Sequence, residues 1–303
     1  MSVGSSPSSK IERLYQAYRR GTVETLHPLV LAHYPALYQA HRDEYRKMME
    51  LSAKMTVVGH ACAEISGYAY DQRRQMIAHL FGGCCFLADS FIDDFGMAAA
   101  DDYLSRLERL LTDGWFEIKT PREELFYVII ARLFTERDVL NADLRQAILL
   151  LLRAQQRDVR LRGTLRSFRR TSRRQQLELL REIARNRSGH AILVLTGFLV
   201  PKIPSVVLRY IFLAGSIIMH IDDHGDHYSD LHYRRVTYMN QLASPAKTLG
   251  RIVRSGIREL LDGLPKGNGR DILVEFLTKY YVTRLKKHRA VKAQRTVAWA
   301  VYE

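Results

Sequence analysis

The chain has few of the residues that interrupt helices or build disulfide frameworks. Its 303 residues include only 18 glycines and 8 prolines, and this scarcity favours helices over a protein of strands and turns. Its 3 cysteines are Cys62, Cys84 and Cys85. Two of them are adjacent and one is left over, which excludes a disulfide framework. Reduced thiols are typical of the cytoplasm, where we expect the protein to act.

A clean membrane-spanning segment is also missing. Residues 191–221 are the most apolar stretch, but two prolines and two basic residues interrupt it: Pro201, Lys202, Pro204 and Arg209. No run of about 20 apolar residues is left, so we predict two buried helices joined near Pro201. Residues 1–10 are small and polar and lack the apolar stretch of a signal peptide. We predict that they form a disordered tail.

Apolar residues recur at helical spacing along almost all of the remaining chain. Helices are predicted over residues 11–18, 45–62, 72–95, 101–111, 121–134, 142–152, 174–199, 205–223, 242–261 and 271–293. Residues 27–44 contain two prolines and are predicted to form a broken helix. No pattern of paired strands is evident. With 47% hydrophobic residues, the chain predicts a single all-α domain over residues 11–303, built as a helical bundle.

The charge is strongly basic, with a formal net charge of +14 at pH 7. Such an excess attracts nucleic acid, anionic lipid or phosphorylated small molecules. Arginines are densest in residues 153–174, where Phe168 is the only aromatic residue, so stacking on nucleic-acid bases is not expected. Two interpretations stay open for this segment: a solvated helix face and loop, or peripheral contact of the segment from Arg153 to Arg174 with an anionic membrane.

Two aspartate clusters lie far apart, each within an apolar run. The segments are DSFIDD at residues 89–94 and DDHGD at residues 222–226. Asp89 and Asp93 are four residues apart, as are Asp222 and Asp226, and on a helix this spacing places both carboxylates on one face. Asp94 and Asp223 stand beside these pairs. Three further aspartates are explained equally well by helix capping or ion pairs with arginine: Asp101, Asp102 and Asp230.

Carboxylate pairs on facing helices are suited to magnesium and diphosphate. Mg²⁺ prefers oxygen ligands and is usually held by one or two carboxylates together with water and substrate phosphates. It would draw charge from a diphosphate leaving group, so that an allylic C–O bond ionises. A di-iron bundle would need Glu-x-x-His pairs, which neither cluster has. Three histidines near the second cluster have poor spacing for zinc: His220, His224 and His227.

An allylic cation would need an apolar cavity with aromatic walls. Candidates for that wall are Phe86, Phe91 and Phe198. Ordinary core packing is the alternative interpretation of the same side chains.

The two aspartate segments resemble the motifs of the class I isoprenoid synthases, an all-α superfamily with two aspartate-rich motifs on opposite walls of a helical cavity. DSFIDD is similar to the first motif in the D-x-x-x-D-D form of squalene and phytoene synthases, and DDHGD matches D-D-x-x-D. The resemblance implies an isoprenoid synthase bundle around an apolar cavity, with three Mg²⁺ ions when substrate is bound. It implies that Asp89, Asp93, Asp222 and Asp226 are catalytic and hold metal, supported by Asp94 and Asp223.

The same resemblance assigns roles to basic residues. The segment ARNRSGHAILVL at residues 184–195 stands where the family has a cation and a helix break facing the diphosphate. It implies that Arg187 contacts diphosphate, with Arg185 as the substitute, and that Gly189 marks the break at the cavity.

Basic residues after the second motif are further candidates. Arg234 and Arg235 lie just past it and are expected to contact diphosphate. The C-terminal segment offers Tyr280, Arg284 and Lys287, which either fold over the diphosphate or lie on an exposed helix face.

Two motifs that are missing here indicate which members of the superfamily the chain resembles. The Gly-Gly-Lys-Arg segment of chain-elongating prenyltransferases and the N-D-x-x-S-x-x-x-E motif of common terpene cyclases are both absent. Residues 221–231 read I-D-x-x-x-D-x-x-x-D-L and resemble the bacterial large-terpene synthases of the tetraprenyl-β-curcumene type.

We therefore expect a Mg-dependent terpene synthase, a lyase that ionises a linear polyprenyl diphosphate and then cyclises or deprotonates the cation. Two alternatives are head-to-head condensation of two prenyl diphosphates and a non-catalytic basic helical protein that binds lipid or nucleic acid. The resemblance also allows a homodimer.

Overall fold

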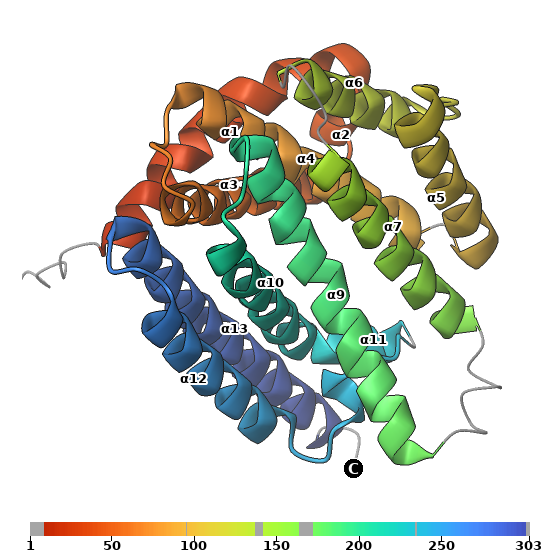
Figure 1. Ribbon diagram of the computed structural model, residues 1–303. Coiled ribbons are helices and arrows are strands. Elements are labelled where there is room, and N and C mark those ends of the chain that lie inside the picture. The colour runs from red at the N-terminus through yellow and green to blue at the C-terminus, as the bar shows by residue number, and fades with distance from the viewer. Residues whose placement is uncertain (1–8, 95, 137–141, 164–171, 234, 301–303) are drawn as a thin grey trace, which may run out of the picture.

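The computed structural model describes residues 9–94, 96–136, 142–163, 172–233 and 235–300, and within these ranges it describes no side chain of residues 90–98, 162–163 or 293–300. Helices account for most of the described chain, which contains no strand (Figure 1). Their bounds are α1 Lys10–His33, α2 Pro35–Gln39, α3 Arg42–Ile65, α4 Gln72–Asp94, α5 Gly96–Asp113, α6 Pro121–Thr135, α7 Ala142–Gly163, α9 Arg173–Leu199, α10 Ser205–Gly225, α11 His227–His232, the 3₁₀ turn η1 Met239–Gln241, α12 Pro245–Gly263 and α13 Asn268–Ala300. The predicted all-α bundle is confirmed.

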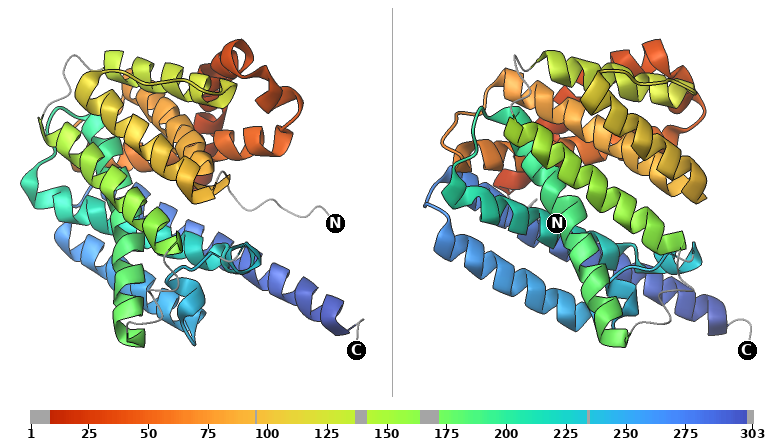
Figure 2. Two further views of the ribbon diagram at one scale, coloured as in Figure 1. Left: turned by 90° about the vertical axis from the view of Figure 1, so that its right-hand side faces the viewer. Right: turned by 45° about the vertical axis from the view of Figure 1, so that its right-hand side comes forward.

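Helices α9 and α10 pack against each other, and α3, from the N-terminal part of the chain, contacts the C-terminal helix α13 directly. Helix α10 packs against α9, α12 and α13, while α4 packs against α3, α5 and α6. Figure 2 shows α12 and α13 on one side of this arrangement and α5 and α6 on the other. The C-terminal ends of α4 and α10, which carry the two aspartate motifs, are thus held by helices from distant parts of the chain.

Local sequence accounts for several helix boundaries. The predicted break in residues 27–44 is confirmed: α1 continues through Pro28 to His33 and ends before Pro35, which begins α2. A residue that precedes proline is pushed out of the helical region, and Tyr34 has φ −152° and ψ 66°. Helix α1 begins at Lys10, with the Ser9 side chain accepting from the Glu12 N–H, so the predicted tail is wrong for residues 9–10. Its residues 1–8 lie outside the described residues.

Helix α9 passes through Gly189 without a break, so the break predicted there is wrong. The glycine serves packing instead. A β-carbon at Gly189 would collide with the ring of Phe212 on α10, and one at Gly215 would collide with the carbonyl of Ser188 on α9. The two glycines therefore let α9 and α10 approach closely.

Helix α10 is, within the described chain, long and apolar enough to cross a membrane by length and composition. The core takes up much of its apolar surface, since Ile211, Ala214 and Ile221 are completely buried, whereas Val206 and Leu208 near its start are exposed. Helix α9 ends at Leu199 and α10 begins at Ser205. The prediction of two buried helices joined near Pro201 is confirmed.

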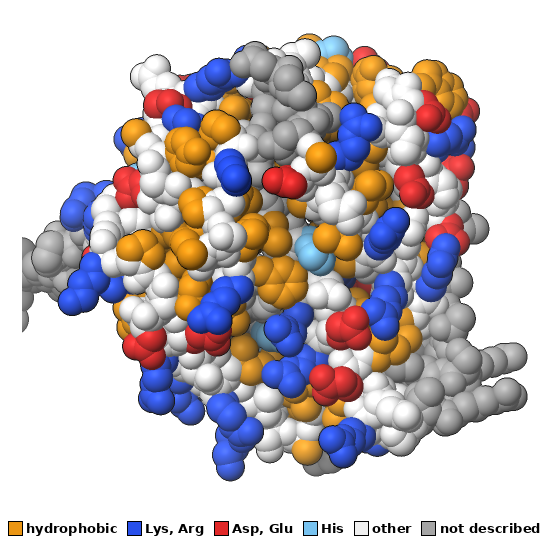
Figure 3. Space-filling view, in the orientation of Figure 1, with side chains coloured by type: hydrophobic (Ala, Val, Ile, Leu, Met, Phe, Trp, Pro, Cys, Tyr) orange, Lys and Arg blue, Asp and Glu red, His pale blue; other side chains and the backbone are white. Residues whose placement is uncertain are grey.

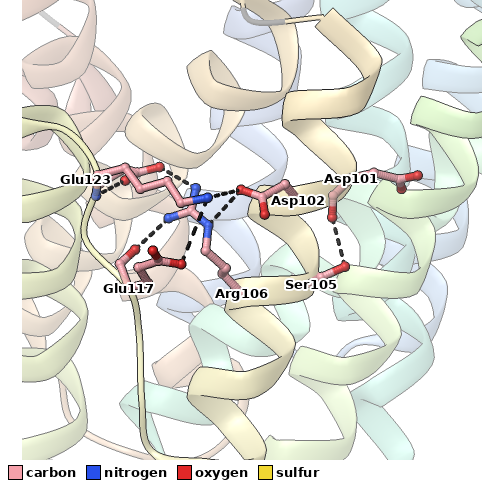
Figure 4. A network of polar contacts seen from close by, with 7 residues as sticks. Asp101, Asp102, Ser105, Arg106, Glu117 and Glu123 are labelled. Carbon is pink, nitrogen blue, oxygen red and sulfur yellow. Dashed lines mark hydrogen bonds and ion pairs between the residues drawn. The ribbon is translucent and has the colours of Figure 1, made fainter.

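A buried ion-pair network fixes α5 to α6 (Figure 4). The Arg106 guanidinium donates to Glu123 at 2.6 Å, to Asp102 at 3.0 Å and to the Glu117 carbonyl at 2.6 Å. The Lys119 ammonium also binds Asp102, at 2.9 Å. For Asp102 the ion-pair interpretation therefore holds, and this aspartate has a structural role.

Candidate active site

The second aspartate motif lies at the C-terminal end of α10 and faces α13. Asp222 is in the last turn of α10, and Asp226 follows its last residue. The Arg284 guanidinium reaches both: its two terminal nitrogens lie 3.2 and 3.0 Å from the two Asp226 oxygens, and one of them also binds Asp222. The predicted convergence of these two carboxylates is confirmed, because one side chain contacts them both.

Other groups of α13 complete this contact. The Tyr280 hydroxyl donates to Asp222 at 2.5 Å, and the Lys287 ammonium donates to Asp226 at 3.1 Å. Burial lowers the pKa of Arg284 to about 10, which still leaves it charged at neutral pH. The three C-terminal candidates therefore lie at the second motif, and the exposed-face interpretation is wrong for Tyr280 and Arg284, which are only partly exposed.

The first motif is described at Asp89 alone. Its carboxylate is about half exposed and accepts from Arg187 at 3.3 Å. The predicted ligands Asp93 and Asp94 belong to α4 by their backbone, but their side chains, like that of Phe91, lie outside the described residues.

Arg187 of α9 joins the first motif to α7. Besides Asp89, its guanidinium contacts Asp158 at 3.0 Å and Gln155 at 2.9 Å. The side chain of Asp158 is 7% exposed. Sequence analysis missed this residue, although it is the one acidic residue in the arginine-rich segment at 153–174.

Asp223 is buried within electrostatic range of this same cluster. Burial raises the pKa of Asp223 to about 8, the positive charge of Arg187 opposes that rise, and Asp230, Asp158 and Asp226 add to it. Arg187 thus interacts with an aspartate of each motif, and its predicted contact with diphosphate stays a prediction.

A polar pocket of about 890 Å³ opens beside the second motif. Asp222, Asp226 and Asp230 line it, as does Phe86, which lies in α4 one turn before Asp89. Asp89 does not line this pocket. Basic side chains come from α3, α13 and the loop after α11: Arg46, Lys47, Lys54, Arg235, Lys279, Arg284 and Lys287.

Lys54 is the most informative of the basic residues that sequence analysis missed. Burial and the neighbouring charge of Arg284 lower the pKa of its ammonium. The sequence could have pointed to Lys54, because this lysine stands within an apolar stripe of α3, where Ala53 and Val57 are completely buried. A partly desolvated lysine on a pocket wall is suited to an anionic ligand.

An apolar cavity of about 100 Å³ lies between α4, α5, α6, α7 and α9. Its aromatic lining residues are Phe81, Phe126, Phe134 and Phe198. Ala88 also lines it and immediately precedes Asp89. Of the predicted cavity residues, Phe198 lies in this wall, whereas Phe86 lines the polar pocket and Gly189 packs against α10. The role of this cavity in holding a substrate stays a prediction.

Three other basic candidates lie in different places. Arg235 lines the polar pocket, while Arg234 lies outside the described residues. Arg185 lines a different pocket, formed by α9, α10 and α12, so its predicted role as a substitute for Arg187 is wrong. Residues two apart on a helix point to nearly opposite faces, and Arg187 takes the face toward the aspartates.

The arginine-rich segment is described in part. Residues 164–171 lie outside the described residues. Arg157 of α7 pairs with Glu182 at 2.6 Å, and Arg173 contacts Gln241 at 2.9 Å. Contact of this segment with an anionic membrane stays a prediction.

The donor groups fit a hard cation better than zinc. Within the described residues, no set of three or more His, Cys, Asp or Glu side chains is arranged to hold a metal. The carboxylates of Asp222, Asp226 and Asp230 nevertheless line one pocket together with cations. Mg²⁺ needs few protein ligands when a phosphate supplies the remaining oxygens.

Comparison with known proteins found little similarity in sequence. No protein-family model matches the chain, and no curated protein matches it. The chain is similar to the crystal structure of squalene synthase HpnC from Alicyclobacillus acidocaldarius, with a TM-score of 0.45 and 16% sequence identity over 92% of this chain and 95% of that chain.

Proposed function

We propose that the protein is a Mg-dependent class I isoprenoid synthase that ionises a linear polyprenyl diphosphate and releases diphosphate. The observation that carries the proposal is one juxtaposition. Helix α4 contributes Ala88 to a wholly apolar cavity, and the adjacent Asp89 to a carboxylate and arginine cluster with Arg187. A substrate with an anionic head and an apolar tail would find both environments at this helix end.

Three carboxylates would hold the metal: Asp89, Asp222 and Asp226, with the predicted Asp93, Asp94 and Asp223 beside them. When bound, Mg²⁺ would supply Lewis-acid stabilisation of the diphosphate leaving group. Arg284 and Lys287 would then exchange their carboxylate partners for phosphate oxygens. A guanidinium can bind either group through two parallel N–H bonds, so this exchange conserves hydrogen bonds.

Further cations would position the diphosphate. Lys54 and Arg235 line the same pocket as Arg284. Their positive charges would stabilise the negative charge that develops on the leaving group as the C–O bond breaks. Once released, the diphosphate can itself accept the proton that the hydrocarbon cation loses.

The apolar cavity would receive the hydrocarbon chain. Its phenylalanine rings exclude water and present π-faces that stabilise a cation. Its volume of about 100 Å³ is well below the roughly 300–1,000 Å³ of ordinary ligand pockets. A long prenyl chain therefore enters only if wall side chains such as Phe134 or Phe198 move.

Two outcomes of ionisation are compatible with this site. The form of the second motif favours a terpene synthase that acts on a single substrate. The D-x-x-x-D-D form of the first motif and the polar pocket of about 890 Å³ favour head-to-head condensation, which needs room for two diphosphates. The similar solved structure is titled a squalene synthase, which corresponds to the head-to-head alternative.

A product assay tests the proposal. Purified protein is incubated with Mg²⁺ and, separately, with linear prenyl diphosphates from C10 to C35, and extracts are analysed by mass spectrometry. A product of unchanged carbon number identifies a terpene synthase, and a doubled carbon number identifies head-to-head condensation. Both should be lost with EDTA and in Asp89→Ala. Folded protein that forms no product from any substrate would overturn the proposal and favour the non-catalytic binding protein.

A further inference from the structure

A second basic pocket lies on the face of α10 turned away from Asp222. It has a volume of about 300 Å³ and lies between α9, α10 and α12. His220 of α10 lines it and stands two residues before Asp222, which on a helix is a rotation of about 200°. Helix α9 likewise presents different arginines on two faces. Arg187 contacts Asp89, whereas Arg181 and Arg185 line this second pocket.

The pocket is lined by a buried histidine whose Nδ1 has no hydrogen-bond partner within the described residues. This histidine, His220, is 2% exposed. An imidazole ring carries at least one N–H donor in either protonation state. A buried polar atom without a hydrogen bond costs about 1–3 kcal/mol, which a ligand with acceptor oxygens would offset.

Arginines surround the mouth of this pocket. Arg181 and Arg185 come from α9 and Arg251 from α12. In the described part of the chain, none of the three guanidinium groups makes an ion pair or a side-chain hydrogen bond. Glu259 is the one carboxylate among the lining residues, so the net charge at the pocket is positive. Figure 3 shows basic side chains gathered over the lower half of the face on which α9 and α12 lie.

We propose that this pocket binds a phosphate-type anion, separately from the aspartate motifs. Guanidinium groups from two helices would clamp its oxygens in bidentate geometry, and the His220 N–H would donate to one of them. The apolar wall, which includes Leu213, Ile217 and Ile252, strengthens these bonds by excluding water. The anion is either a free phosphate or diphosphate, or the headgroup of an anionic lipid, because the arginines at the mouth are exposed.

Binding is tested on the full chain without Mg²⁺ and with EDTA present. Inorganic phosphate and inorganic diphosphate are titrated by calorimetry into the wild type and the pocket variant Arg185→Gln/Arg251→Gln. The matched control is Arg254→Gln/Arg258→Gln, which removes two exposed charges of α12 outside the pocket. We expect at least about 10-fold weaker binding in the pocket variant and less than about twofold in the control.

A third variant, Arg284→Gln, separates this pocket from the proposed active site. Anion binding at His220 should survive it unchanged, whether or not the protein makes a product from prenyl diphosphates. Co-sedimentation with vesicles of phosphatidic acid in phosphatidylcholine, against phosphatidylcholine alone, tests the lipid source with the same variants. The proposal stands if the pocket variant, unlike the control variant, binds either the inorganic anions or the phosphatidic acid vesicles more weakly than the wild type. It is overturned if wild type binds neither ligand, if pocket and control variants lose binding equally, or if Arg284→Gln abolishes it.

Discussion

Arg284 of α13 binds both Asp222 and Asp226 of the second aspartate motif. The same guanidinium thus occupies oxygens that a metal ion would need, and it lies beside the pocket that a diphosphate would enter. In the proposed enzyme Arg284 therefore has two opposed effects. It competes with Mg²⁺ before substrate binds, and it holds diphosphate afterwards.

Replacing Arg284 with glutamine separates these effects. We expect Mg²⁺ to bind the substrate-free variant more tightly than the wild type, because its competitor is gone. The rate of product formation should fall by about 100-fold, as is common when a donor to a developing anion is removed. Titration of Mg²⁺ without substrate and steady-state kinetics measure the two quantities. Arg289→Gln, at an exposed position of the same helix, should change neither, and weaker Mg²⁺ binding in Arg284→Gln would contradict the competition.

Removing one carboxylate charge from each motif tests whether both act together. Asp89→Asn and Asp222→Asn should each lower kcat by about 100-fold or more. Each removes a carboxylate that would bind the metal, and the metal's stabilisation of the transition state is several kcal/mol. Asp262→Asn changes an exposed aspartate of α12 and should leave kcat unchanged. Circular dichroism checks that all three proteins are folded. Full activity in Asp89→Asn would remove the first motif from the mechanism.

The sequence was sufficient for the helices and for the convergence of Asp222 with Asp226, because both follow from local periodicity. It was insufficient for Asp158 and Lys54, whose importance depends on partners from distant helices: Arg187 for one and Arg284 for the other. Arg185 was misassigned because an arginine two residues away on the same helix faces the aspartates. The break expected at Gly189 failed for a related reason, since its missing side chain makes room for Phe212 rather than for a bend.

The apolar cavity should control substrate length. Phe198→Leu enlarges it next to Phe81 and Phe134, and we expect the preference to move toward longer prenyl diphosphates. Competition between two chain lengths in one reaction, read by mass spectrometry, measures the change. Phe116→Leu alters a buried ring outside the cavity and controls for loss of packing alone. An unchanged preference in Phe198→Leu would place the hydrocarbon chain elsewhere.

His79 should make the protein less stable in mild acid. Burial lowers its pKa to about 4 from 6.5, so the unfolded chain takes up a proton before the folded chain does. Stability is complete above the unfolded pKa and falls as pH decreases from about 6.5 toward about 4. By pH 5 this group alone should remove about 2 kcal/mol. Urea unfolding at pH 7 and pH 5 should show that loss in the wild type and a smaller one in His79→Asn, which cannot be protonated; equal losses would contradict it.

The ion pair of Arg106 with Glu123 should stabilise the fold without taking part in catalysis. Both side chains are nearly buried, with 3% and 5% exposure, and the pair ties α5 to α6 rather than to either motif. Arg106→Met should cost about 3–5 kcal/mol, because it leaves the Glu123 carboxylate buried without that cation. The double variant Arg106→Met/Glu123→Leu should recover much of the loss, since replacing both partners removes the buried charge. Urea unfolding of the two variants measures this, and product formation by whatever fraction stays folded should match the wild type. A double variant no more stable than Arg106→Met would show that packing around the guanidinium, and not its charge, holds α5 in place.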